Sequence, residues 1–168
     1  METKKITILG IGCSLLADQG FGVRVIQALM ERFDFQENVQ LVDGGLIGVG
    51  LIGTIAQTDH LIVIDAISNN GNPGDIYRLE GRQILQRLAG RNHIQQVEFL
   101  EALAHCQALD NPPQAVLLGI EPGDTHTLTC ELTTVLKGKM DAMTAQVLEE
   151  LHRLGVVYRK KEEKKACA

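Results

Sequence analysis

Short apolar runs alternate with amphipathic segments along the chain. The runs rich in Ile, Val and Leu predict five strands, over residues 6–9, 38–43, 60–66, 75–80 and 115–120. Apolar residues at helical spacing predict five helices, over residues 23–33, 46–56, 82–88, 94–105 and 133–154. Strands that alternate with helices in this way predict an α/β fold with a largely parallel sheet.

Two of the predicted strands give further detail of the sheet. The run His60–Ala66 is apolar almost without interruption, which is typical of a strand that is covered on both faces of a parallel sheet. The short run Asp75–Glu80 follows a cluster of turn residues and is more polar, so we expect it at an edge of the sheet.

Length and composition limit the classes of protein. A chain of 168 residues suits one domain, which we place at residues 1–157, and the charged segment 158–168 predicts a disordered tail. The net charge is −5 and the basic residues are scattered outside the tail, which argues against a nucleic-acid partner. No apolar run is long enough to span a membrane, so we expect no membrane association and a cytoplasmic location. The four cysteines form no CxxC pair.

Polar side chains occur where the predicted strands end or where the adjoining helices begin. They are Asp18, Gln19, Asp43, Asp65, His93 and Glu121. Because ligands bind outside the carboxyl ends of parallel strands, several of these side chains are expected to meet at one edge of the sheet. One imidazole with carboxylate oxygens would suit a divalent metal such as zinc or nickel and would leave coordination positions open. Taken singly, each residue also fits a plain role in an Asx turn or a helix cap.

Three other motifs are weaker matches. Gly10 and Gly12 resemble the start of a dinucleotide-binding fingerprint, but Leu15 stands where its third glycine should be. Ser14 could join His93 and Asp65 in a triad, yet no GxSxG elbow surrounds it. Cys13 with His93 could form a thiol dyad, although no neighbouring residue marks that thiol as activated.

Taken together, the motifs resemble the endopeptidases that mature the large subunit of [NiFe] hydrogenases. The resemblance runs from Lys5 to about Gly155. The matching segments are Gly10-Ile-Gly12, Asp18-Gln19-Gly20-Phe21-Gly22-Val23-Arg24, Asp43-Gly44-Gly45, Ile64-Asp65-Ala66, His93 and Gly119-Ile-Glu-Pro122.

This resemblance implies a fold and an activity. The fold would be a three-layer α/β sandwich, in which a twisted, mostly parallel five-stranded sheet carries helices on both faces. The protein would be a monomeric hydrolase, a metal-dependent or aspartyl-type endopeptidase without a classical protease nucleophile. Its partner would be the nickel-loaded precursor of the hydrogenase large subunit, from which it would remove a C-terminal extension. The nickel would be carried by that substrate and not permanently bound by the enzyme.

The resemblance also implies site residues. The metal-contacting positions fall on Gln19, Asp65 and His93, and the catalytic residues would be Asp18, Asp65 and His93. Gln19 replaces the acid that the family has in the first loop, and Cys13 replaces its asparagine. Asp18 could supply the missing carboxylate, Gln19 could bind through its amide oxygen, or the activity could be altered. The substitution Gln19→Glu is expected to preserve or increase the activity.

Two other classes of function stay open at this point. The first is a non-proteolytic assembly factor that binds the hydrogenase large subunit, because both departures from the family pattern lie at the site. The second is a small-molecule or nucleotide-binding α/β protein, which the incomplete glycine pattern disfavours.

Overall fold

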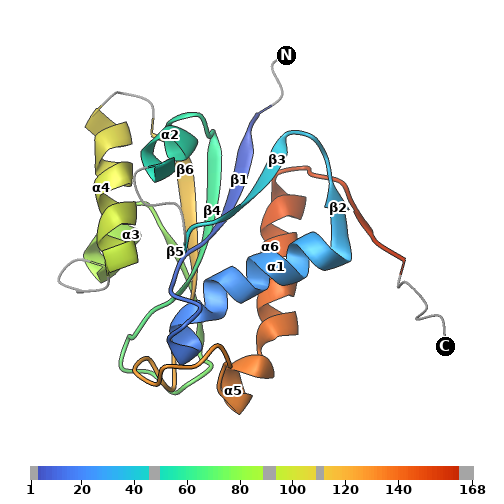
Figure 1. The fold of residues 1–168 in the computed structure, drawn as a ribbon. Helices are drawn as coiled ribbons and strands as arrows, with labels where there is room; N and C mark the ends of the chain where they lie inside the picture. The colour runs from blue at the N-terminus through green and yellow to red at the C-terminus, as the bar shows by residue number, and fades with distance from the viewer. Residues whose placement is uncertain (1–3, 46–49, 89–93, 109–111, 163–168) are drawn as a thin grey trace.

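The computed structural model describes residues 4–45, 50–88, 94–108 and 112–162 (Figure 1). The strands are β1 (Ile6–Gly10), β2 (Phe33–Phe35), β3 (Val39–Asp43), β4 (His60–Ala66), β5 (Ile76–Glu80), β6 (Gln114–Ile120) and β7 (Tyr158–Lys160). The helices are the 3-10 helix η1 (Ala17–Gly20), α1 (Phe21–Arg32), α2 (Gly50–Ala56), α3 (Arg82–Leu88), α4 (Ile94–Ala108), α5 (Thr134–Lys137) and α6 (Met140–Arg153). Within these ranges no helix is both long and apolar enough to cross a membrane.

Five strands form one sheet in the order β3-β1-β4-β6-β5. All neighbours in it are parallel except β5, which runs antiparallel to β6 at the edge. Gly10 at the end of β1 is in register with Asp43 at the end of β3 and with Ile64 of β4, which extends two residues further. The prediction of a mostly parallel five-stranded α/β sheet is confirmed.

The sheet is buried on both faces by helices. Alternate residues of the central strands point to opposite sides: Ile62 and Ile64 of β4 join one apolar cluster, and Leu61 and Val63 join the other. The first cluster includes residues of α1 and α6, and the second includes residues of α2, α3 and α4 (Figure 1). This two-sided burial explains why the sequence of β4 is apolar throughout.

The long helix predicted over residues 133–154 is interrupted. The structure has α5 over Thr134–Lys137 and a separate α6 from Met140, with Gly138 and Lys139 between them. Glycine has a low helix propensity, and Lys139 N–H bonds the carbonyl of Leu136, three residues back, which interrupts the α-helical pattern. The apolar spacing continued across the break and therefore concealed it.

The prediction of a disordered tail from residue 158 is wrong for its first three residues. Tyr158–Lys160 form β7, which pairs antiparallel with β2, a strand that the sequence did not indicate. The Tyr158 ring packs edge-on against Phe33 at 5.6 Å between centroids, and Arg159 bonds Asp34 at 2.9 Å. These cross-strand contacts order a segment whose composition alone predicts disorder. Residues 163–168 lie outside the described residues.

The edge strand β5 is joined to α6 by an ion pair. Arg78 Nε and Nη2 bond the two carboxylate oxygens of Glu150 at 2.7 and 3.0 Å, and the Glu150 side chain is only 6% exposed. The hydrogen bonds from Arg78 lower the pKa of Glu150. Such bidentate, charge-assisted bonds are among the stronger polar contacts in proteins.

We expect Glu150→Gln to lower the free energy of unfolding by about 2 kcal/mol, because the variant loses the charge and part of the three hydrogen bonds that this carboxylate accepts, two from Arg78 and one from Arg153. The difference from the wild type should be full above pH 4.5, the ordinary pKa of this group. It should shrink as the pH falls through the lowered pKa, because the wild-type carboxylate then takes up a proton. Urea unfolding of the wild type and the variant at a series of pH values measures this difference in unfolding free energy.

Glu149→Gln is the matched control. Glu149 is the neighbouring residue of α6, and its ion pair with Arg153 has both side chains about half exposed (53% and 49%). Exposed pairs contribute about 0.5 kcal/mol or less, so this variant should change stability little. Equal effects of the two substitutions would show that the Arg78 pair does not hold β5 to α6.

Candidate active site

The loop after β1 lies close against the end of β4. Gly12 has φ +130, and a Cβ atom there would lie 1.8 Å from the carbonyl oxygen of Gln19. Gly22, at the start of α1, lies so near β4 that a Cβ would lie 2.2 Å from the carbonyl oxygen of Ile64. Only glycine permits these approaches. The two glycines therefore place η1 at the carboxyl edge of the sheet.

Asp18 lies at the centre of this edge and is fully buried. Its Oδ2 accepts hydrogen bonds from the backbone N–H groups of Gly123 and Asp124 at 2.8 and 2.9 Å. Thr133 donates its N–H to Oδ1 at 2.8 Å and its hydroxyl to Oδ2 at 3.0 Å. The carboxylate thus holds the loop after β6 against the loop after β1. These contacts favour a structural role for Asp18 over the catalytic role predicted from the sequence.

Backbone hydrogen bonds join the same two loops. Thr129 donates its N–H to the carbonyl of Leu15 and accepts from Ala17, at 3.0 and 2.9 Å, in a short parallel bridge. Asp18 N–H also donates to the carbonyl of Asp124 at 3.0 Å. Ala17 has φ +41, a conformation that residues other than glycine seldom adopt and that the surrounding bonds must maintain.

Gln19 is half-buried, and its side chain is also held by the second loop. Its amide nitrogen donates to the carbonyl oxygen of Thr125 at 2.9 Å. No hydrogen bond to the amide oxygen is made by the residues that the structure describes. The bond to Thr125 was not visible in the sequence, because 106 positions separate the two residues. It requires a donor at position 19, which a carboxylate lacks.

Asp65 is the second predicted metal contact that the structure describes. It lies one residue before the end of β4, opposite Gly119 of β6, and is 3% exposed. The backbone N–H of Ile11, in the first loop, donates to the carbonyl of the preceding Ile64 at 2.9 Å. Asp65 and the loop of Gln19 therefore meet at the same edge, as predicted. His93, the third contact, lies outside the described residues.

Two other acidic residues at this edge accept hydrogen bonds from neighbouring loops and strands. Asp43 accepts the N–H of Gly45 at 3.0 Å, which is an Asx turn. Glu121 is buried and accepts the N–H of Asn69 at 2.7 Å and the hydroxyl of Tyr77 at 2.8 Å. Burial, and then the bond to Glu121, raise the pKa of Tyr77, so its phenol stays a donor. Both carboxylates hold loops in place.

Among the described residues, Cys13, Cys106 and Cys130 are free thiols. Cys106 is buried in α4, where burial raises the pKa of its thiol and makes the thiolate unfavourable. Within the described ranges, no three His, Cys, Asp or Glu side chains group closely enough to hold a metal ion. Both of the proposed nucleophile arrangements, on Ser14 and on Cys13, depend on His93 and stay predictions.

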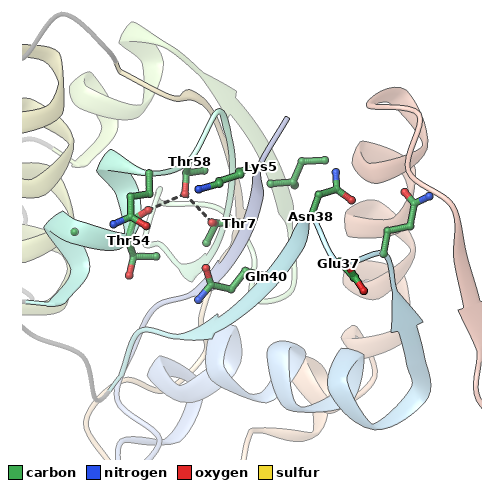
Figure 2. A pocket seen from close by; sticks show the side chains of 11 residues that line it. Lys5, Thr7, Glu37, Asn38, Gln40, Thr54 and Thr58 are labelled. Atoms are coloured by element: carbon green, nitrogen blue, oxygen red, sulfur yellow. Dashed lines mark hydrogen bonds between the residues drawn. The ribbon is translucent and has the colours of Figure 1, made fainter. Parts of the chain in front are cut away.

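A large hollow lies at the opposite end of the sheet. It encloses about 1020 Å³ between the amino ends of β1 and β3 and the helix α2. Figure 2 shows its polar lining, in which the hydroxyls of Thr7 and Thr58 bond each other at 2.7 Å and Thr58 donates to the carbonyl of Thr54. Of the predicted site residues that the structure describes, none lines it. The hollow is thus separate from the candidate site.

The fold and the site define an α/β protein with its polar residues collected at the carboxyl edge of a parallel sheet. The family profile described as "Hydrogenase maturation protease" matches residues 23–150. The chain therefore belongs to the hydrogenase maturation protease family.

Individual relatives agree with this assignment. The chain is 34% identical over 161 residues to the hydrogenase expression/formation protein HupD of Thiocapsa roseopersicina, covering 95% of this chain and 73% of that protein. It is 30% identical over 154 residues to the hydrogenase 2 maturation protease of Escherichia coli, covering 90% of this chain and 93% of that protein. The structure of the hydrogenase maturating endopeptidase HybD from E. coli superposes with a TM-score of 0.88 at 28% identity, over 94% of this chain and 98% of that one.

The contacts of Asp18 give a prediction that distinguishes a structural role of this residue from a purely catalytic one. We expect Asp18→Asn to lower the free energy of unfolding by about 2–3 kcal/mol, because its NH₂ group cannot accept the N–H groups that face the carboxylate. Calorimetry should show the loss, and amide exchange should speed up at Gly123, Asp124 and Thr133. A purely catalytic aspartate would leave both measurements unchanged.

Asp43→Asn is the control for this substitution. Asp43 is half-buried and accepts one backbone N–H, which an asparagine oxygen can also accept. We expect its unfolding free energy to stay within about 0.5 kcal/mol of the wild type. A comparable loss in both variants would mean that replacing either carboxylate at this edge destabilises the loops in the same way.

Proposed function

We propose that this protein is an endopeptidase that removes a C-terminal extension from the precursor of a [NiFe] hydrogenase large subunit. The observation that carries the proposal is the match to the hydrogenase maturation protease family over residues 23–150. The fold supports it, because the structure of the hydrogenase maturating endopeptidase HybD from E. coli superposes on 94% of this chain with a TM-score of 0.88.

We propose further that the enzyme recognises nickel already inserted in the substrate. A nickel ion whose coordination is incomplete accepts oxygen and imidazole ligands, and the candidate contacts are Gln19, Asp65 and His93. Asp65 would supply the anionic oxygen, and the amide oxygen of Gln19 a neutral one. Such contacts would dock the cleavage segment only after nickel insertion. Asp18 is assigned here to holding the loops.

The contact proposed at position 19 is neutral, because a glutamine side chain carries no charge. Because Thr125 accepts from the amide nitrogen, the amide oxygen is the atom left to face a ligand. An amide oxygen is a weaker donor to a cation than a carboxylate oxygen but still a hard oxygen ligand. The proposed site thus contacts the metal with one negative charge from its described residues, that of Asp65.

The test of the function is cleavage of the purified precursor, prepared with and without inserted nickel and followed by its mass. The expected result is loss of the C-terminal peptide from the nickel-loaded precursor alone. Asp65→Ala should abolish the cut, because the anionic contact is lost, while circular dichroism confirms that the variant is folded. Cleavage of both precursor forms at equal rates would contradict nickel recognition. Binding without any cleavage would favour the assembly factor.

Position 19 gives a graded test of the metal contact. Gln19→Leu removes the oxygen at similar volume, and we expect kcat/KM to fall by about tenfold or more. Gln19→Glu restores a stronger ligand but loses the donor to Thr125, so we expect cleavage to be kept and stability to fall by about 1–2 kcal/mol. Full activity of the leucine variant would remove Gln19 from the site.

A further inference from the structure

The two loops that Asp18 joins carry exposed apolar side chains on one surface. Leu15 is 56% exposed and Leu128 is 80% exposed, the largest exposure of any large apolar side chain in the described ranges. Each leucine immediately precedes one residue of the bridged pair Leu16 and Thr129. Neighbouring strands that pair in parallel direct equivalent side chains to the same face. Leu15 and Leu128 thus occupy equivalent positions beside this bridge, and we name these two exposed side chains the leucine lip.

The leucine lip is fixed in position relative to the candidate site. The N–H of Thr129 bonds the carbonyl of Leu15 itself, so the two halves of the lip are joined directly. Leu15 lies four positions before Gln19, and Leu128 three positions after Thr125, the two residues that bond each other at the site. A peptide that reaches Gln19 would pass close to the lip.

The surroundings of the lip are polar. The segment Thr125–Thr129 holds three threonines and one histidine beside Leu128. The carboxylate of Asp124 is turned into its own loop, where it accepts the N–H groups of His126 and Thr127 and the Thr127 hydroxyl. These bonds hold the pKa of Asp124 at about 2. Asp124 is therefore an anion whose hydrogen-bond donors lie in its own loop, and the lip itself offers a ligand its two apolar leucine side chains.

We propose that Leu15 and Leu128 bind an apolar side chain of the precursor's C-terminal segment and so help to select the substrate. The proposal rests on the proposed function. Two leucines are too little surface for a stable interface between whole proteins, which needs about 800 Å² on each partner. An extended peptide suits the lip better, because it can place one side chain there while its backbone continues to the site.

The test is the cleavage kinetics of Leu15→Ser and Leu128→Ser with the nickel-loaded precursor. Each substitution should raise KM about tenfold, because an apolar contact of this size is lost, and should leave kcat within about twofold. Thermal unfolding should not change, since both side chains are exposed. Leu128→Met, which stays apolar, should keep the wild-type KM.

Val157→Ser is the matched control. Val157 is 68% exposed, between the two leucines in exposure, and lies beside β7, away from the carboxyl edge of the sheet. Its KM should equal that of the wild type. Equal KM values for Leu128→Ser and Val157→Ser, with the wild type cleaving normally, would overturn the lip and leave the proposed function intact.

The substrate offers the complementary experiment. Apolar residues near the cut in the precursor are changed to serine one at a time, and one of them should raise KM with the wild-type enzyme but not with Leu128→Ser. Such non-additivity identifies a direct contact. If the wild type binds without cutting, the same variants are compared by their Kd for the precursor, and unchanged values in the leucine variants would overturn the lip.

Discussion

The site depends on the burial of one carboxylate, that of Asp18. A buried charge is costly unless donors surround it, and here four hydrogen bonds from Gly123, Asp124 and Thr133 do so. All of those donors belong to the segment after β6, whereas Asp18 belongs to the loop after β1. The charge therefore fixes the distance between two loops that the sheet alone would leave independent. Ala17 and Gln19, on either side of Asp18, bond the same segment through the carbonyl oxygens of Thr129 and Thr125.

The sheet provides the frame for this arrangement, and its strands could be predicted from the sequence. The apolar runs of β1, β4 and β6 are local signals, and burial on both faces makes them continuous. Asp65 could be placed at the carboxyl edge of the sheet, because it follows the apolar run of β4. The edge position of β5 followed from its short length and polar composition.

Contacts between distant parts of the chain could not be predicted in this way. The residues that bond Asp18 lie 105 to 115 positions away, and no periodicity links them to it. The same is true of β7, whose pairing with β2 depends on aromatic contacts between Tyr158 and Phe33. Sequence patterns report which residues are buried, but not which buried polar groups meet. The catalytic role that the resemblance implies for Asp18 stays a prediction, and the structure adds the hydrogen bonds by which its carboxylate joins two loops.

The neutral residue at position 19 is consistent with the neighbouring backbone. Thr125 presents a carbonyl oxygen to this side chain, and its position is set by the loop that Asp18 holds. A carboxylate at position 19 would oppose that oxygen, whereas the amide donates to it. Asp18 and Gln19 are thus coupled. The carboxylate of Asp18 holds the loop that carries Thr125, and the Thr125 carbonyl favours an uncharged donor at position 19. An acid at position 19 would require a change in the loop of Thr125, whose carbonyl oxygen would otherwise face a carboxylate. The proposed metal contact at position 19 is therefore linked to the hydrogen bonds that hold this loop.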